Sequence, residues 1–104
     1  MFRALSAIVL LVLLFSWAQE SRADEKSAGI FSTKCAGCHG AGGRGDSPAG
    51  KNMGAPDLTK TTTAKSAADL QAVIEKGKNK MPAYGKSLTA GEIAGLAAYI
   101  KSMK

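Results

Sequence analysis

Apolar positions recur at helical spacing in three stretches of this chain, and no stretch alternates as a half-buried strand would. The first stretch covers residues 25–35, where Phe31 and Cys35 stand four positions apart and share one face. The other two are marked by Leu70, Val73 and Ile74, and by Ile93, Leu96, Ala97 and Ile100, with Tyr99 widening the last stripe. The pattern predicts an all-α domain with three main helices.

Local signals indicate where the second and third helices begin. Ser66-Ala67-Ala68-Asp69 and Thr89-Ala90-Gly91-Glu92 both have the spacing of a capping box, in which the side chains pair with free N–H groups of the first turn. Gly77 is well placed to end the second helix. We therefore expect a loop from Lys78 to Leu88 between these two helices.

A glycine-rich segment from Gly40 to Lys65 interrupts the helical pattern, because its glycines disfavour helix and strand alike. Two interpretations are open. The segment is either a disordered linker or a loop folded closely over a flat cofactor, where glycines let the backbone approach. The second interpretation is favoured by the residues that break up the polar run, which are Pro48, Met53, Pro56 and Leu58.

Residues 1–23 have the organisation of a secretory signal. Arg3 supplies a positive start, residues 4–18 are almost all apolar, and Ser21-Arg22-Ala23 places small residues around a cleavage point. The apolar run is shorter than the about 20 residues that span a bilayer. We expect export of one domain, residues 24–104, to a periplasm. A thylakoid lumen, or tethering to the membrane by an uncleaved signal, is the alternative.

The two cysteines and the single histidine of the chain form one run, Cys35-Ala36-Gly37-Cys38-His39. Such a run is typical of covalent c-type haem attachment, in which two thiols bind the macrocycle and the imidazole faces the iron. A thioredoxin-like pair would need a neighbouring βαβ pattern, and a zinc site would need a carboxylate as fourth ligand. A disulfide across two residues would close almost no loop. The run predicts one haem c bound through Cys35 and Cys38, with His39 as an iron ligand.

The second axial position of the iron has three candidate methionines. Met81 stands in the loop between the last two helices, where Pro82 favours an extended conformation for it. Met53 lies in the glycine-rich segment, and Met103 lies at the C-terminus, where it suits packing. Spacing and context favour Met81, whose thioether would raise the reduction potential. An open position would instead indicate a gas binder or a peroxidase-like catalyst.

A metal-ligating histidine usually donates its other ring N–H to a backbone carbonyl or a similar acceptor. Pro56 and Pro48 both offer a carbonyl in the segment after His39. The alternative is that both prolines only stiffen the loop.

Positive charge surrounds the expected ligand loop. The formal net charge is +6, and four lysines bracket Met81, namely Lys76, Lys78, Lys80 and Lys86. Such a ring would steer acidic partner proteins, although a solvated, solubilising surface is the alternative. Export and the absence of tryptophan after Trp17 argue against nucleic acid as partner. We expect a monomer that meets redox proteins through their acidic faces and meets membranes only through membrane-bound partners.

Four segments in order resemble the class I, single-haem cytochromes c, in particular the small soluble bacterial and photosynthetic-lumen kinds. The resemblance spans Ala28 to Ile100. Its segments are Phe31 with the Cys35–His39 run, Gly54-Ala55-Pro56-Asp57-Leu58, Lys80-Met81-Pro82-Ala83-Tyr84-Gly85, and Leu96-Ala97-Ala98-Tyr99-Ile100.

The resemblance implies a cytochrome c fold around one haem, and a one-electron carrier between redox proteins that is not an enzyme. A small haem enzyme or gas sensor with a labile sixth ligand is the alternative. It also implies Met81 as the axial ligand, Pro56 as the partner of His39, and haem contacts from Phe31, Leu58 and Tyr99. Ser27 stands where the family often has glycine, so we expect a shifted or looser crossing of the terminal helices.

Overall fold

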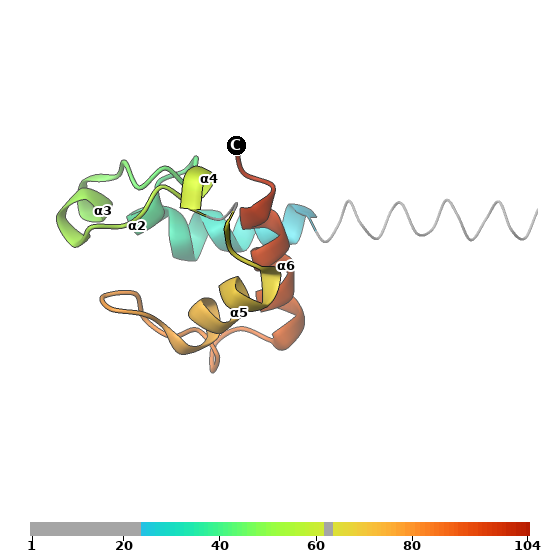
Figure 1. The fold of residues 1–104 in the computed structure, drawn as a ribbon. Helices are drawn as coiled ribbons and strands as arrows, with labels where there is room; N and C mark the ends of the chain where they lie inside the picture. Colours follow the sequence, from blue (N-terminus) through green and yellow to red (C-terminus); the bar gives the residue numbers. More distant parts are fainter. Residues whose placement is uncertain (1–23, 62–63) are drawn as a thin grey trace, which may run out of the picture.

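The computed structural model describes residues 24–61 and 64–104 (Figure 1). A helix over residues 24–30 is followed by η1 (Phe31–Cys35), α2 (Ala36–His39), α3 (Pro48–Met53), α4 (Leu58–Thr61), α5 (Ala67–Lys76) and α6 (Ala90–Lys101). The described residues form no strand, only one isolated antiparallel bridge between Lys78 and Met81. The all-α class is confirmed. The proposed signal, residues 1–23, lies outside the described residues.

The first helix is longer than the sequence pattern predicted. Residues 24–30, η1 and α2 follow one another without a loop, so the helix expected over residues 25–35 extends to His39. We call residues 24–39 the attachment helix. In η1 the N–H of Ala36 donates to the carbonyl of Phe31, five residues earlier, which is a π turn. Inserted π turns recur at functional sites, and this one ends at Cys35, the first residue of the run to His39.

The two capping boxes are formed as predicted. Ser66 Oγ accepts the Asp69 N–H at 3.1 Å and Asp69 Oδ2 accepts the Ser66 N–H at 3.3 Å. The same exchange between Thr89 and Glu92 begins α6. Gly77 ends α5 as expected, with a φ of 76° that favours glycine. In the described part of the chain, no helix is both long and apolar enough to cross a bilayer.

The glycine-rich segment is folded over its described residues and holds two short helices that the pattern did not predict. Ser47 begins α3, where its Oγ accepts the Gly50 N–H at 3.0 Å. Gly54 ends α3 in the left-handed region, at a φ of 72°. The Leu58 N–H donates to the Gly43 carbonyl at 2.7 Å, and the Leu58 side chain is buried at the start of α4. The linker interpretation is therefore wrong for the described residues of the segment, and the closeness of this loop to a cofactor stays a prediction.

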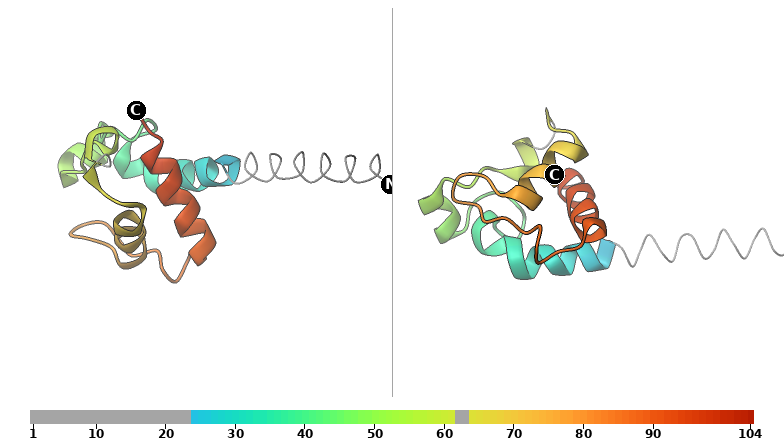
Figure 2. Two further views of the ribbon diagram at one scale, coloured as in Figure 1. Left: turned by 45° about the vertical axis from the view of Figure 1, so that its right-hand side comes forward. Right: turned by 90° about the horizontal axis from the view of Figure 1, so that it is seen from below.

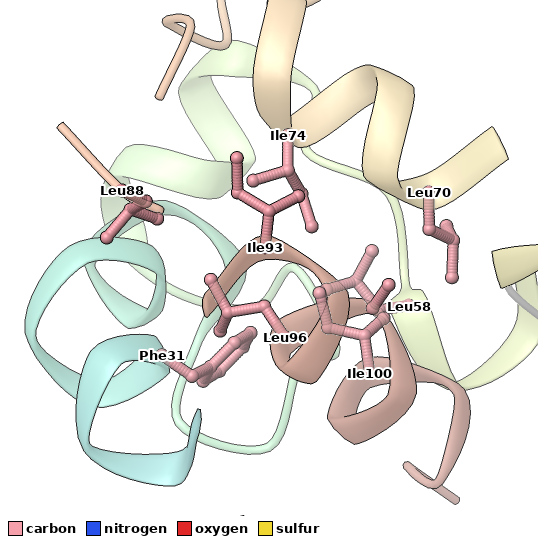
Figure 3. Close-up of a cluster of buried hydrophobic side chains, with 9 residues drawn as sticks. Phe31, Leu58, Leu70, Ile74, Leu88, Ile93, Leu96 and Ile100 are labelled. Atoms are coloured by element: carbon pink, nitrogen blue, oxygen red, sulfur yellow. The ribbon is translucent and has the colours of Figure 1, made fainter. Parts of the chain in front are cut away.

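The core lies where α6 meets the attachment helix and α5 (Figure 3). Phe31 and Leu96 are its fully buried large side chains, with 2% and 0% of their surface exposed. Burying a side chain of this kind contributes about 1.5–3 kcal/mol. Tyr99 packs on Phe31 with ring centroids 5.7 Å apart at an interplanar angle of 56°. The core therefore joins the two ends of the domain and fixes the wall that carries Cys35 and His39.

The crossing of the terminal helices is close, in contrast to the looser crossing that Ser27 suggested (Figure 2). Ser27 is buried, and a Cβ placed on Gly95 of α6 would lie 2.7 Å from its Oγ. The glycine that allows the two helices to approach closely is therefore Gly95 on α6, whereas the attachment helix has Ser27 at the crossing.

Candidate functional site

A cavity of about 440 Å³ opens between the attachment helix and the segment that follows α5. All but one of the site residues expected from the sequence line it: Phe31, Cys35, Cys38, His39, Pro56, Leu58 and Met81. These residues come from both halves of the chain. The exception is Tyr99, which is not part of the lining and packs on Phe31.

The attachment run presents its three reactive side chains to this cavity. Cys35 and Cys38 are half-buried free thiols, and burial is the main cause that raises the pKa of Cys35. Burial lowers the pKa of His39, so the imidazole is neutral at pH 7, the form in which histidine binds metals. Its Nδ1 is buried and has no hydrogen-bond partner among the described residues. An unpaired buried nitrogen costs about 1–3 kcal/mol, so the site is incomplete without a further partner.

The glycine-rich segment holds the end of the attachment helix in place. Ser47 Oγ donates to the Cys38 carbonyl at 2.8 Å, and the Gly45 N–H donates to the His39 carbonyl at 2.7 Å. A Cβ on Gly50 would collide with the Cys38 carbonyl, so only glycine permits this approach of α3. The helix carbonyls left free at its end are thus satisfied by the backbone and side chains of this segment.

Residues 77–85, which we call the Met81 segment, form part of the opposite wall and contribute Lys78, Asn79, Lys80, Met81, Pro82 and Tyr84 to the lining. The Met81 N–H donates to the Lys78 carbonyl at 2.9 Å, and the Lys78 N–H donates back at 3.2 Å. The segment returns to α5, where the Tyr84 N–H donates to the Ile74 carbonyl at 2.9 Å. A Cβ on Gly77 would lie 2.7 Å from the Met81 carbonyl, so glycine is required at that turn by space as well as by φ. Met81 itself is half-buried on the cavity wall.

The other two methionines occupy different positions. Met53 also lines the cavity, but it ends α3 with 49% of its surface exposed. Met103 is not part of the lining and packs against the core, where its Sδ lies 2.5 Å from the place a Cβ on Gly43 would take. The packing role expected for Met103 agrees with this placement, and Met81 is the more buried of the two cavity methionines.

The two prolines also differ in placement. Pro56 lines the cavity, and its carbonyl oxygen lies 3.0 Å from an ideal Cβ on Gly45, beside the backbone that follows His39. Pro48 is the first residue of α3 and is not part of the lining. No hydrogen bond joins His39 Nδ1 to a carbonyl of the described residues. The pairing of His39 with Pro56 stays a prediction.

Several lining residues were missing from the sequence-based site. Leu70, Val73 and Ile74 of α5 supply apolar wall, and Lys34 and Lys65 join the expected Lys78 and Lys80. Tyr84 also lines the cavity, and its hydroxyl donates to the Lys34 carbonyl at 3.1 Å. Burial, more than the nearby Cys35 and Cys38, raises the pKa of Tyr84, so the phenol remains a donor at neutral pH. The helical stripe of α5 could have indicated its apolar residues, but the Tyr84 contact had no sequence signal.

The residues present fit a haem. The cavity is largely apolar, two thiols stand three residues apart on one wall, and a buried imidazole nitrogen has no hydrogen-bond partner in the described part of the chain. The zinc alternative is not supported, because no three His, Cys, Asp or Glu side chains gather into a metal site within residues 24–61 and 64–104. The thioredoxin-like alternative would need a βαβ unit, and the described residues form no sheet that could hold one.

Comparison with known proteins agrees with this chemistry. Residues 22–100 match the family described as cytochrome C oxidase, cbb3-type, subunit III. The chain is similar to the cytochrome c6 of Gloeothece citriformis, with 34% identity over 107 aligned residues that cover 96% of this chain and 93% of that protein. It is 37% identical to the cytochrome c6 of Rippkaea orientalis, over 96% of this chain and 92% of that one. The cytochrome c6 of Anabaena variabilis is 44% identical over 70% of this chain and 83% of its own.

Proposed function

The chain belongs to the class I, single-haem cytochromes c, and from this premise we propose that it is a soluble one-electron carrier with His39 and Met81 as axial ligands. The observation that carries the proposal is the single cavity that gathers Cys35, Cys38 and His39 on one wall and Met81 on the other. Bound haem c supplies an iron couple that takes up and releases one electron. The rest of the proposal concerns what the protein's own side chains do.

The two walls of the cavity contribute different side chains to haem binding. Cys35 and Cys38 attach the group covalently, and His39 presents a neutral imidazole because burial lowers its pKa. Met81 offers a soft thioether from the opposite wall, a ligand that raises the reduction potential of haem iron. The apolar side chains of Phe31, Leu58 and Ile74 exclude water between the walls.

A carrier is favoured over the enzyme and gas-sensor alternative because both walls of the cavity present a candidate iron ligand, His39 on one and Met81 on the other. A catalyst or sensor needs a ligand position that is open or easily vacated, whereas Met81 is half-buried on a wall fixed to α5 by the Tyr84 and Gly85 N–H groups. Met53 is the second methionine of the cavity, but its greater exposure at the end of α3 makes it the weaker candidate.

We propose that redox partners dock at a positively charged face beside the cavity and exchange electrons there. Four lysines line the cavity, and we call them the lysine rim: Lys34, Lys65, Lys78 and Lys80. Lys76 and Lys86, expected in this ring, are not part of the lining. An acidic partner protein would be steered to this rim before electron transfer. We further propose that residues 1–23 direct export to a periplasm or thylakoid lumen and are removed, leaving a monomer.

Visible spectroscopy of the holoprotein tests the ligand assignment. The protein would be matured with a haem-attachment system, together with the variants Met81→Ala and Met53→Ala. We expect a methionine–iron charge-transfer band in the ferric wild type that is lost in Met81→Ala and kept in Met53→Ala. The opposite result would move the ligand to Met53. A high-spin wild type that binds added ligands at once would favour the enzyme or sensor alternative.

A further inference from the structure

The hydrogen bonds of the Met81 segment place it firmly against α5. The N–H groups of Tyr84 and Gly85 donate to the Ile74 and Glu75 carbonyls at 2.9 and 3.0 Å, and Lys78 and Met81 pair with each other. The segment and α5 are therefore one unit. None of these bonds reaches the attachment helix, which carries His39 and both cysteines on the other side of the cavity.

One hydrogen bond of the described residues crosses from this unit to the attachment helix. The Tyr84 hydroxyl donates to the Lys34 carbonyl at 3.1 Å, across 50 residues of sequence. Lys34 directly precedes Cys35 in the π turn, and Tyr84 follows Met81 by three positions. Lys34, Tyr84 and Met81 all line the same cavity.

Tyr84 is well suited to hold two walls at a fixed separation. Its N–H is bound to Ile74, and its carbonyl accepts the N–H groups of Leu88 and Ser87 at 2.9 and 3.1 Å. The Tyr84 backbone is therefore held on both sides. Its side chain has only two rotatable torsions, so the position of its hydroxyl relative to α5 varies little. A flexible side chain would lose more conformational entropy when it forms the same bond.

We propose that Tyr84 is a positioning residue for Met81, because its hydroxyl latches the Met81 segment to the attachment helix and keeps the two cavity walls closed on each other. The inference rests on the proposed role of Met81 as axial ligand. Without the hydroxyl, α5 and the Met81 segment keep their mutual bonds but separate more readily, as one unit, from the wall that carries His39. An added ligand then competes with Met81 more successfully.

The variant Tyr84→Phe tests the latch, since it removes the hydroxyl and keeps the ring. Imidazole is titrated into the ferric holoprotein while the methionine–iron band is followed. A neutral hydrogen bond contributes about 0.5–1.5 kcal/mol, so we expect imidazole to bind to Tyr84→Phe about two- to twelvefold more tightly than to the wild type.

The matched control is Thr33→Val. It removes a hydroxyl that donates to the Gly29 carbonyl at 3.0 Å and to the Ile30 carbonyl at 3.3 Å, both within the attachment helix. We expect a comparable small change in melting temperature for both variants, and a change in imidazole affinity for Tyr84→Phe alone. That split separates a positioning role from a general loss of stability.

The outcomes distinguish the latch from the function it serves. If the wild-type band is lost in Met81→Ala but Tyr84→Phe binds imidazole with wild-type affinity, the latch is wrong and the ligand assignment stands. If the wild type shows no methionine band, the ligand assignment fails and the latch fails with it. Equal affinity changes in Tyr84→Phe and Thr33→Val would also overturn the latch.

Discussion

Among individual residues, Glu92 links a local capping interaction to the stability of the whole domain. The Thr89 N–H donates to Glu92 Oε1 at 2.9 Å, and this backbone hydrogen bond is the main cause that lowers the pKa of Glu92. Lys26 of the first helix lies 3.6 Å from Glu92 Oε2 and acts in the same direction. The carboxylate therefore favours the folded state in its charged form.

The sign of the resulting pH dependence follows directly. The pKa of Glu92 is lower in the folded state than the about 4.3 of an unfolded chain, so the unfolded state binds more protons as the pH falls. Stability from Glu92 is present above about pH 4.3 and is lost as the pH falls through the folded value. We expect Glu92→Gln to flatten the melting-temperature profile in this range. An unchanged slope between pH 6 and about pH 3 would contradict the assignment.

Functional residues that are neighbours in the sequence could be predicted. Hydrogen-bond partners that lie far apart in the sequence could not. Cys35, Cys38 and His39 form one recognisable run, and Pro82 marked Met81 as a residue in an extended loop. The latch of Tyr84 depends on a carbonyl 50 residues away, so no local pattern indicates it. That His39 Nδ1 is buried without a hydrogen-bond partner among residues 24–61 and 64–104 is likewise a result of the tertiary fold.

At the scale of elements, the crossing of the attachment helix and α6 depends on one pair of small residues. A Cβ on Gly95 would lie 2.7 Å from Ser27 Oγ, closer than real side chains approach. Ser27 is buried, so its hydroxyl has little room to move aside. The side chains at this crossing are therefore coupled.

We expect Gly95→Ala to lower the free energy of unfolding by about 1–3 kcal/mol through overpacking. Adding Ser27→Ala removes the oxygen that the new Cβ meets, so the double variant should recover part of the loss. Denaturant unfolding of the two single variants and the double variant measures this coupling. Gly29→Ala is the control, because a Cβ there meets nothing within 4 Å, and it should be neutral or stabilising. Strictly additive losses would show that the two sites do not touch.

Elements with strong local signals were predicted, and elements held by tertiary contacts were not. Both capping boxes fixed the beginnings of α5 and α6. By contrast, α3 and α4 are short and lie in a segment rich in glycine, where intrinsic propensity is low. They form because Ser47 bonds to the Cys38 carbonyl and Leu58 packs into the core. The π turn of η1 also had no signal in the spacing of apolar residues.

At the scale of the whole molecule, positive charge is gathered around the opening of the cavity. The lysine rim combines residues from the attachment helix, from the loop before α5 and from the Met81 segment. The net charge of the chain is +6, so approaching anions are attracted from a distance. The lysine rim directs them to the cavity because its positive charges are gathered there. The sequence predicted a ring of lysines around Met81, of which Lys78 and Lys80 line the cavity, whereas Lys34 and Lys65 join them only through the fold.

The rim predicts a salt-dependent exchange of electrons with anionic partners. Reduced protein oxidised by hexacyanoferrate(III) should react more slowly as ionic strength rises, and Lys80→Glu should lower the low-salt rate by up to roughly tenfold. Lys104→Glu is the charge-matched control, because the C-terminus lies away from the loop that follows α5 (Figure 1). Equal effects of both substitutions would indicate that only the net charge matters. A rate that is independent of salt would leave the lysines a solubilising role.

The division of the cavity into two walls also has a consequence for biogenesis. Every covalent contact to the cofactor comes from a run of five residues near the start of the domain, whereas Met81 and α5 come from its second half. Attachment therefore requires only this short stretch of the chain, and the second half can fold afterwards onto a first half that already carries the cofactor. This arrangement permits haem attachment and folding to be successive events, with the Met81 segment closing last.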